Sequence, residues 1–511
     1  MSAPLDIPQI NRHALLQGAV GILLCILGFF LARRESYEVR TVLATAGGCN
    51  MRTDIYEARS GTPVGSVILF HGLSANKKAM AFTAQEFANQ ELRVFVPDLP
   101  GHGKTPGPFS PARAETCADA LVRNLAARKA IIPERTILAG HSMGGAIATR
   151  IAANLTVAGV IAISPAPMHP ASLVSSELLL FPRPPVLVAH SLVLSAALEP
   201  ASIRQIAQDL VTKSTNSPIK YDVIPRTTHV SILFSPAAFE AIRSWTSEIL
   251  GTDPTAPLPK NMPQLGCIIG LFGLVILAPS FLREMTTSHS NQSPADSHPP
   301  LSFLRVAFSL AIFSVLTVTL LRFFVPFRFL HIFQGDYLAS LLFIVGAAML
   351  SLQHKSLPGL NSFFTIVAAS SAVAAVVLIL LLGAWFELTF YEAWLTPARW
   401  LRFPILFLAF LPWHLAEELF LGSPTASSRF RRFLHFFAFR GIVWLILVGA
   451  IFYLHSAQFA YVLLIIYFAL FSLLQRLATE VIRLQTRSIP AAAIFGAILL
   501  AGSVLAILPI A

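Results

Sequence analysis

The sequence predicts an α/β domain, with a mostly parallel sheet and helices on both faces, joined to an all-α domain of transmembrane helices. Of the 511 residues, 55% are hydrophobic and only 12% are charged, and the mean hydropathy is +0.67. Globular proteins carry about 25% charged residues, so much of this chain is expected to lie in lipid. Polar residues concentrate in 36–251, where strand-like and helical runs alternate.

The first apolar run, 14–32, is bounded by Arg12 and by the pair Arg33 and Arg34. It reaches the length of about 20 residues that a helix needs to cross a bilayer. No small-residue cleavage site follows it. We therefore interpret residues 1–35 as an N-terminal transmembrane anchor and not as a cleaved signal peptide.

The segment 36–251 is expected to form the α/β domain, because strands separated by helices favour a parallel sheet with helices on both faces. The first two strands have no helix between them, so they are expected to form an antiparallel hairpin at one edge. The expected strands are 39–45, 53–58, 64–70, 93–97, 136–139, 159–164, 185–190 and 219–224. The expected helices are 79–89, 111–129, 144–154, 201–212 and 236–250.

A proline-rich linker, 252–263, leads into a multi-span domain, 264–511, in which nearly every segment is apolar. With the anchor, its eight helices make about nine crossings of the bilayer. A polar loop at 285–300 is expected to be disordered. The expected spans are 264–282, 303–325, 334–352, 362–385, 401–421, 436–455, 457–476 and 489–509.

The net charge of +11 comes from basic residues that flank apolar runs. This distribution indicates membrane topology and anionic lipids, and it argues against nucleic-acid binding. The basic segments 429–440 and 476–487 are expected in the cytoplasm, which places the α/β domain on the other side of a cell membrane. Arg33 and Arg34 argue for the reverse, and we favour the extracytoplasmic placement.

The four cysteines do not indicate a compartment. Cys25 and Cys267 fall in apolar spans, and the spacing of Cys49 and Cys117 suggests neither a metal site nor a disulfide framework.

A Gly-x-Ser-x-Gly motif, Gly140 to Gly144, lies between a short apolar run and a helix of small residues. A strand, a sharp turn and a helix in this order form a nucleophile elbow, which exposes Ser142 at the top of a parallel sheet. Three further blocks follow predicted strands. They are His71-Gly72-Leu73, the run from Asp98 to His102, and Thr227-Thr228-His229.

In this order and spacing, the four blocks resemble the α/β-hydrolase superfamily, most closely its monoacylglycerol lipase, lysophospholipase and serine aminopeptidase-like branch. The resemblance covers about 36–251, and the C-terminal membrane region resembles no family that we recognise. It implies that Ser142 is the nucleophile and His229 its general base. It also implies an oxyanion hole formed by the backbone N–H groups of Leu73 and Met143.

The acid that would orient His229 is harder to assign. In the family the acid follows the strand matched here by 185–190, which points to the position of Leu194, where there is no carboxylate. Glu199 is the nearest candidate and is our prediction. Asp209, Asp222 or the absence of any acid remain alternatives.

Several other polar residues have more than one interpretation. His71, Asp98 and His102 are interpreted as structural loop residues, and His141 as a residue that packs against or lines the elbow. About twenty residues after 164 form either a short apolar lid or an ordinary packed helix.

In the membrane part, His414, Glu417 and Glu418 share one helix face. They could handle protons or bind a metal, but we favour an interfacial stretch. Glu387 and Glu392 are interpreted as part of an interface girdle.

Together these features predict a membrane-embedded serine hydrolase that cleaves carboxylic esters, with lipid-derived esters favoured by proximity to the bilayer. The expected partners are a small-molecule or lipid ester substrate and membrane lipids, with no metal and no cofactor. The alternatives are a transporter-like protein with a regulatory or catalytically weak hydrolase domain, and an amide-cleaving serine hydrolase. The sequence leaves the oligomeric state open.

Overall fold

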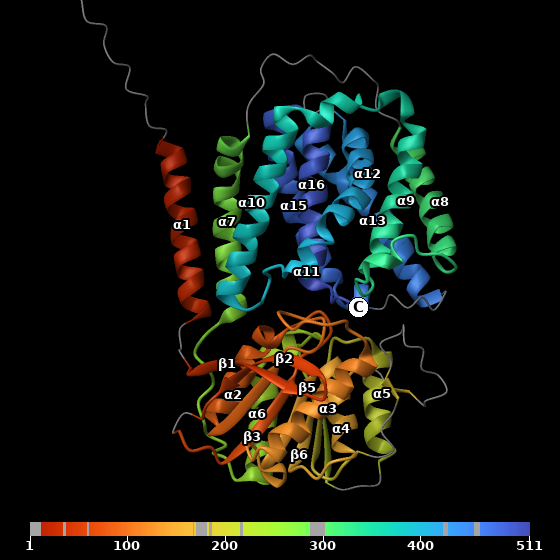
Figure 1. Cartoon of the computed structure of the whole chain (residues 1–511). Helices are drawn as coiled ribbons and strands as arrows, with labels where there is room; N and C mark the ends of the chain where they lie inside the picture. The colour runs from red at the N-terminus through yellow and green to blue at the C-terminus, as the bar shows by residue number, and fades with distance from the viewer. Residues whose placement is uncertain are drawn as a thin grey trace, which may run out of the picture.

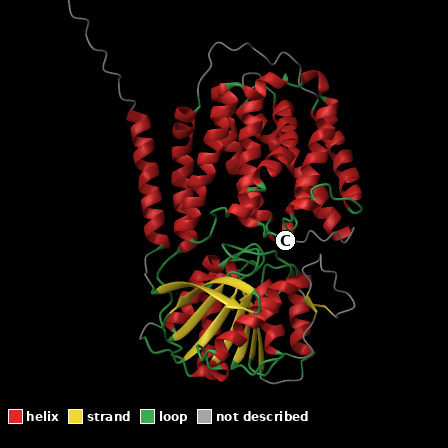
Figure 2. Ribbon diagram, in the orientation of Figure 1, coloured by secondary structure: helices red, strands yellow, loops and turns green. Residues whose placement is uncertain are grey.

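The computed structural model describes residues 12–33, 37–58, 61–166, 168–169, 181–182, 187–214, 218–286, 302–422, 428–453 and 460–511. An α/β domain lies against one end of a bundle of long helices (Figure 1). Figure 2 shows that the strands are confined to the α/β domain and that the bundle is helical. We call the bundle the helical domain.

The α/β domain is built on an eight-stranded sheet with the order β1-β2-β4-β3-β5-β6-β9-β10. β1 pairs with β2, and β2 with β4, in antiparallel fashion, and all other pairings are parallel. The expected hairpin at the sheet edge is therefore confirmed. The strands are β1 (Val39–Ala46), β2 (Cys49–Tyr56), β3 (Gly65–Phe70), β4 (Leu92–Pro97), β5 (Thr136–His141), β6 (Gly159–Ile163), β9 (Ser191–Ala196) and β10 (Ile219–Ile224).

Helices cover both faces of the sheet, as the alternation of strands and helices predicts. α3 (Pro111–Ala127), α4 (Met143–Ala152) and α5 (Ala201–Thr212) pack in one hydrophobic core. α2 (Ala81–Asn89) and α6 (Pro236–Leu250) pack in a second core on the opposite face. The inner strands β3 and β5 are almost wholly buried because both of their faces are covered.

The strand expected at 185–190 is wrong. The chain enters the sheet later, as β9, which runs from Ser191 to Ala196 between β6 and β10. Prolines at 184 and 185 cannot donate to a strand ladder, and His190 has a positive φ of 58°. The apolar run after His190 contains no proline, and it forms the strand between β6 and β10.

A disulfide joins Cys49, at the start of β2, to Cys117 on α3, with a Cα–Cα distance of 5.6 Å. The spacing of these cysteines in the sequence did not suggest this bond. The two residues are separated by 68 positions, and only the packing of α3 beside the hairpin brings them together.

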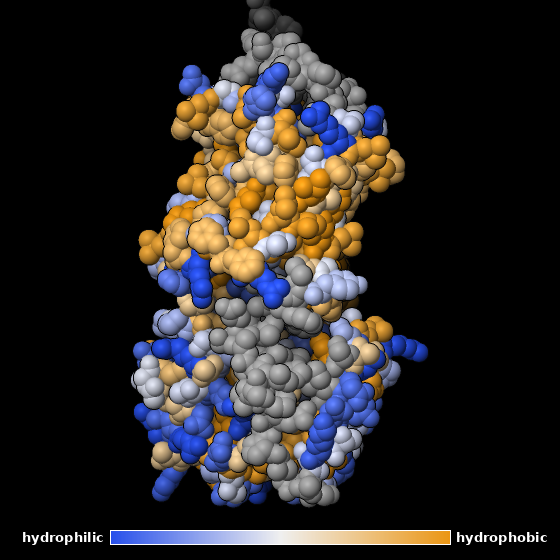
Figure 3. All heavy atoms as spheres, turned by 90° about the vertical axis from the view of Figure 1, so that its right-hand side faces the viewer, coloured by the Kyte–Doolittle hydropathy of each residue, from blue (hydrophilic) through white to orange (hydrophobic). Residues whose placement is uncertain are grey.

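The helical domain contains nine helices that are long and apolar enough to cross a membrane, counted over the described residues. The expected bounds are several residues off for two of them, because the spans expected at 436–455 and 457–476 are α13 and α15. Figure 3 shows hydrophobic side chains over much of the helical domain and hydrophilic ones over the α/β domain. The long helices are α1 (Arg12–Ala32), α7 (Pro263–Met285), α8 (Phe303–Leu321), α9 (Gly335–Leu352), α10 (Ile366–Thr389), α12 (Phe403–Leu421), α13 (Arg429–Tyr453), α15 (Ile465–Thr486) and α16 (Ile489–Ile507).

The N-terminal helix α1 packs along α7 through glycines (Figure 1). A Cβ atom on Gly28 would lie 2.5 Å from the carbonyl oxygen of Gly266, and one on Gly266 would lie 2.4 Å from that of Gly28. Such small residues allow the backbones of two helices to approach closely. The N-terminal helix α1 is therefore packed as part of the helical domain.

Two expectations fall largely outside the described residues. They are the short cap after 164 and the polar loop at 285–300. Of the cap, Phe181 is described and buried, and it begins β8 (Phe181–Pro182), which pairs with β7 (Met168–His169).

Candidate active site

Ser142 lies between β5 and α4 with φ 53° and ψ −116°, a conformation that non-glycine residues rarely adopt. Its neighbours require glycine at the flanking positions. A Cβ atom on Gly140 would lie 2.2 Å from the carbonyl carbon of Gly144, and one on Gly144 would lie 2.2 Å from the carbonyl oxygen of Phe70. The five-residue motif therefore forms the tight strand-to-helix corner that its sequence predicts.

The two predicted oxyanion donors lie on either side of this corner. Met143 is the first residue of α4, where backbone N–H groups have no partner within the helix. Leu73 follows Gly72 at the end of β3, and a Cβ atom on Gly72 would lie 3.2 Å from the Cβ of Ser142. The Gly72-Leu73 loop thus passes directly beside the serine.

His229 follows β10, and its Nδ1 lies 2.6 Å from Oε1 of Glu199. The Glu199 side chain is fully buried, whereas that of His229 is 12% exposed. Oε2 of Glu199 accepts a hydrogen bond of 3.4 Å from the backbone N–H of Ala196. Within the described residues, Nε2 of His229 is buried and has no hydrogen-bond partner. The imidazole is therefore held by Glu199 at Nδ1, and its Nε2 is available to accept a proton.

The position of β9 explains where Glu199 comes from. β9 ends at Ala196, so Glu199 is the third residue after the strand. Leu194 is a buried strand residue opposite Asp222 of β10, and the expectation that it marks the acid position is wrong. Asp222 is exposed, and Asp209 lies 3.8 Å from Lys213 on α5. Among the three candidates, Glu199 is the carboxylate that the structure brings to His229.

His141 connects the elbow to the loop that carries His229. Its Nε2 lies 2.7 Å from the carbonyl oxygen of His229, and the two rings are 4.9 Å apart. Burial lowers the pKa of His141 to about 3, so the ring is neutral and its Nε2–H donates to that carbonyl. The residue before Ser142 therefore helps to hold His229 against the elbow.

His71 holds the Gly72-Leu73 loop from the other side. Its Nε2 accepts a hydrogen bond of 2.9 Å from the backbone N–H of Leu99. The proton must then be on Nδ1, which donates to the carbonyl oxygen of Gly72 over 2.8 Å. Burial lowers the pKa of His71 to about 4, and this neutral tautomer persists near pH 7.

The helical domain contacts the same loop. The hydroxyl of Tyr391, which follows α10, donates to the carbonyl oxygen of Ser74 over 2.7 Å. The Asn76 side chain donates to the carbonyl oxygen of Glu392 over 3.3 Å and accepts from its N–H over 3.4 Å. The loop that carries Leu73 therefore lies between the sheet and the helical domain.

Two lysines of the α/β domain form ion pairs across this junction. Lys77 is buried between Asp98, at 3.2 Å, and Glu392. Lys104 lies 2.6 Å from Glu387. Glu387 and Glu392, interpreted from the sequence as part of an interface girdle, both pair with lysines of the α/β domain and so dock the two domains.

The chain end also contributes to this junction. Ile510 accepts a hydrogen bond of 2.6 Å from the N–H of Phe109 and donates one of 3.1 Å to the carbonyl oxygen of Gly101. Arg399 donates to Gly101 over 3.0 Å and to Leu508 over 2.8 Å. The loops after β3 and β4 therefore face the helical domain. The carboxyl-terminal end of β5, where Ser142 lies, is on the same side of the sheet.

Inside the helical domain, His414, Glu417 and Glu418 lie toward the end of α12 and are buried among helices. Glu417 forms two hydrogen bonds with Arg440 of α13, of 2.7 and 2.9 Å. Glu418 pairs with Arg476 of α15. Across the described residues, no group of three or more His, Cys, Asp or Glu side chains is arranged to hold a metal ion.

Comparisons with known proteins relate this geometry to a family. The model of the Alpha/beta hydrolase family matches residues 67–460, which is more than half of the chain. Over 101 residues the chain is 37% identical to protein phosphatase methylesterase 1 of Mus musculus, covering 19% of this chain and 26% of that protein. The chain thus aligns with about a quarter of the length of this relative.

Solved structures with low sequence identity are also similar. An alpha-beta serine hydrolase homologue from Coxiella burnetii is 17% identical, covers 42% of this chain and 99% of its own, and has a TM-score of 0.33. An esterase of Pyrococcus furiosus is 17% identical, covers 42% and 92%, and has a TM-score of 0.35. The family match extends further along the chain than either structure. On that match, this chain belongs to the alpha/beta hydrolase family.

Proposed function

We propose that this protein is a membrane-embedded serine hydrolase that cleaves carboxylic esters through an acyl-Ser142 intermediate. The observation that supports it best is the contact of 2.6 Å between Glu199 and His229. It supplies the carboxylate that orients the imidazole and stabilises its positive charge. The strained corner at Ser142 and the unpartnered Nε2 of His229 add to this support.

In the first half of the reaction, Nε2 of His229 accepts the proton of the Ser142 hydroxyl as Oγ attacks the ester carbonyl carbon. The carbonyl oxygen becomes an oxyanion, which the backbone N–H groups of Leu73 and Met143 stabilise. Each donor of this kind contributes about 2.7–4 kcal/mol in other hydrolases. The protonated His229 then gives its proton to the leaving alkoxide, so an alcohol departs and acyl-Ser142 remains.

In the second half, His229 accepts a proton from water, and the resulting hydroxide attacks the acyl carbon. The second oxyanion collapses, the bond to Oγ breaks, and His229 returns the proton to Ser142. The products are a carboxylic acid and an alcohol, and the side chains return to their starting protonation. Glu199 remains ionised throughout and keeps the Nδ1 proton of His229 in place.

A lipid-derived ester is the substrate class we favour. The carboxyl-terminal ends of the parallel strands, where Ser142 lies, face the helical domain. Tyr391 and Glu392 of that domain contact the loop beside the serine. Nine helices suited to crossing a membrane would hold this edge close to a bilayer surface. Esters held in that surface would then need only a short movement to reach the site.

We also propose that the α/β domain lies outside the cytoplasm. The disulfide between Cys49 and Cys117 is the support, because such bonds persist in oxidising compartments and are rare in the cytosol. Arg283, Arg432 and Arg487 lie at the opposite end of the helical domain, where the preference for positive charge in the cytoplasm would place them.

The direct test uses the full-length protein in detergent and a fluorescent fluorophosphonate, which reacts with activated serines. The wild type should be labelled and should hydrolyse short-chain aryl esters, and Ser142→Ala should lose both properties. Ser244→Ala changes an exposed serine on α6 and serves as the matched control. Undiminished labelling of Ser142→Ala would mean that another residue is the nucleophile.

A further inference from the structure

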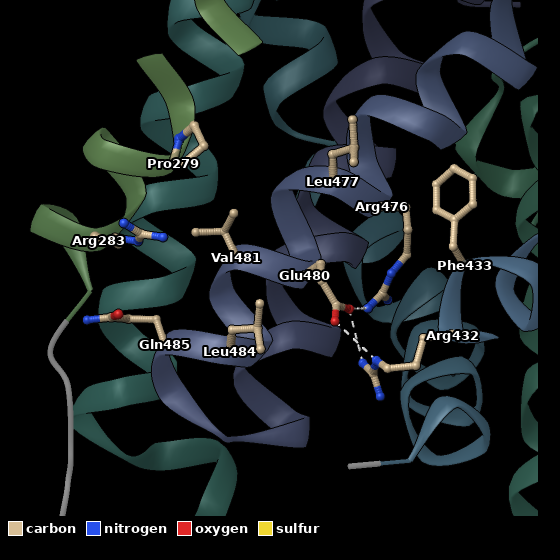
Figure 4. Close-up of a pocket in the computed structure, with 10 residues that line it drawn as sticks. All are labelled: Pro279, Arg283, Arg432, Phe433, Arg476, Leu477, Glu480, Val481, Leu484 and Gln485. Carbon is tan, nitrogen blue, oxygen red and sulfur yellow. Dashed lines mark hydrogen bonds and ion pairs between the residues drawn. The ribbon is translucent and has the colours of Figure 1, made fainter. Parts of the chain in front are cut away.

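A cavity of about 520 Å³ lies in the helical domain at the end far from the α/β domain. Its walls come from α7, α13 and α15 (Figure 4). This volume falls in the range of about 300–1,000 Å³ that is typical of ligand sites. Residues of the proposed hydrolase site take no part in it.

The polar wall of the cavity has an excess of positive charge. Arg283, Arg432 and Arg476 line it together with a single carboxylate, that of Glu480. Arg432 lies 3.1 Å from both oxygens of Glu480, and Arg476 also pairs with Glu480 (Figure 4). Arg283 is exposed and forms no ion pair within the described residues. With side chains in their ordinary charge states, these four groups carry a net charge of +2.

An apolar wall lies beside the polar one at similar depths, because Leu477 and Val481 alternate along α15 with Arg476 and Glu480. Leu477, Val481 and Leu484 of α15 line the cavity together with Pro279 of α7, and Val481 points toward α7 (Figure 4). Leu477 lies eight residues before Gln485, which corresponds to about 12 Å along the helix. The apolar wall therefore extends from the helix end into the bundle, whereas Arg283 and Gln485 lie in the last turns of α7 and α15.

The charged groups at the helix ends, Arg283 and Arg432, together with an apolar wall that continues into the bundle, match a lipid that enters from one bilayer surface. The ends of α7 and α15 lie where headgroups would lie if these helices cross a bilayer. A phosphate there would face the arginines, and an acyl chain would follow the apolar wall. Arginine is well suited to phosphate because its guanidinium donates paired hydrogen bonds.

We propose that this cavity binds one anionic phospholipid from the leaflet opposite the α/β domain. The phosphate contacts Arg283 and the outer face of the Arg432–Glu480–Arg476 cluster. An acyl chain lies along Val481 and Leu477. Ser142 is at the other end of the molecule, so this lipid is a structural or regulatory ligand and not the substrate.

The test measures lipid retention by native mass spectrometry on the full-length protein. Phosphatidylglycerol and phosphatidylcholine with identical acyl chains are compared, and inorganic phosphate is added as a competitor. We expect one phosphatidylglycerol to be retained in preference to phosphatidylcholine and not to be displaced by phosphate. Equal retention of the two lipids would contradict the proposal, as would displacement by phosphate alone.

Two variants probe the two walls separately. Arg283→Gln removes a charge that forms no ion pair with any described residue, and it should weaken phosphatidylglycerol binding about fivefold. Val481→Trp should fill the apolar wall and remove the preferentially bound lipid. Arg305→Gln, at an exposed position near the same end on α8, is the matched control and should bind like the wild type.

Unchanged retention in both cavity variants would overturn the assignment. Ser142→Ala should retain the lipid fully, because the cavity is distant from the elbow. A failure of the proposed hydrolase function would therefore show in labelling and turnover, and a failure of the lipid site would show in retention.

Discussion

The hydroxyl of Tyr391, at the end of α10, donates a hydrogen bond of 2.7 Å to the carbonyl oxygen of Ser74, in the loop that follows β3. Leu73, the residue before this carbonyl, carries a predicted oxyanion donor. The helical domain is thus hydrogen-bonded to the loop beside Ser142.

Removal of that hydrogen bond should affect turnover more than binding. We expect Tyr391→Phe to lower kcat by up to about tenfold with little change in KM, because one neutral hydrogen bond contributes about 0.5–1.5 kcal/mol. Steady-state ester hydrolysis measures both constants. Tyr453→Phe, at an exposed tyrosine of α13, is the control. A Tyr391→Phe enzyme with wild-type kcat would exclude this role.

Loss of the contact between Glu199 and His229 should lower kcat much more. Glu199→Gln retains the side-chain shape but loses the charge that orients and stabilises the imidazole. We expect kcat to fall by about 10³–10⁴-fold, as in other triads that lose the acid. Asp209→Asn, on the surface of α5, should leave kcat unchanged. A loss of similar size in Asp209→Asn, with Glu199→Gln active, would reverse the assignment.

The Cys49–Cys117 disulfide should stabilise the α/β domain. Removal of a disulfide of this kind costs about 2–5 kcal/mol of stability. We expect the double variant Cys49→Ala/Cys117→Ala to lose fluorophosphonate labelling at a clearly lower temperature than the wild type. Cys25→Ala, which changes a free thiol in α1, is the control.

The redox state of the same pair can be read in membranes prepared with a thiol-blocking reagent. The disulfide should be present without added oxidant if the α/β domain faces an oxidising compartment. Two reduced thiols at Cys49 and Cys117 in such membranes would contradict the proposed orientation.

Buried neutral histidines should make the α/β domain sensitive to acid. Burial lowers the pKa of His71 to about 4 and that of His141 to about 3, from an ordinary value of 6.5. Between pH 6.5 and 4 the unfolded chain therefore binds protons that the folded chain does not. Stability is fully present above pH 6.5 and falls as the pH drops, by about 2–3 kcal/mol per histidine at pH 4.5.

Thermal unfolding across this pH range measures the effect. His141→Gln should unfold at a temperature that changes less between pH 6.5 and 4.5 than the wild-type value does. His190→Asn, at an exposed position of the same domain where φ is 58°, should retain the full dependence. An identical pH dependence in His141→Gln and the wild type would mean that His141 is not the buried neutral group described here.

Local patterns in the sequence determined the alternation of strands and helices, the edge hairpin and the nine apolar helices. These features depend on periodicity, run length and turn residues, all of which act over a few neighbouring positions. The elbow at Ser142 belongs to the same class, because its glycines and its positive φ lie within five residues.

Only the tertiary structure decided which of two adjacent apolar runs enters the sheet. The runs 185–190 and 191–196 have similar composition, and the choice depends on pairing with β6 and β10. That choice moved the end of the strand from His190 to Ala196. It thereby placed Glu199, and not the position of Leu194, beside His229.

The other contacts that the sequence did not predict join residues that are distant in the chain. Cys49 and Cys117 are 68 positions apart, and Lys77 and Glu392 are 315 apart. A cysteine or a buried carboxylate carries no local signal of its partner, because the pairing depends on where whole helices and strands pack. The sequence therefore determined the elements and the elbow, whereas the acid beside His229, the disulfide and the contact of the helical domain with the Ser74 loop depended on three-dimensional packing.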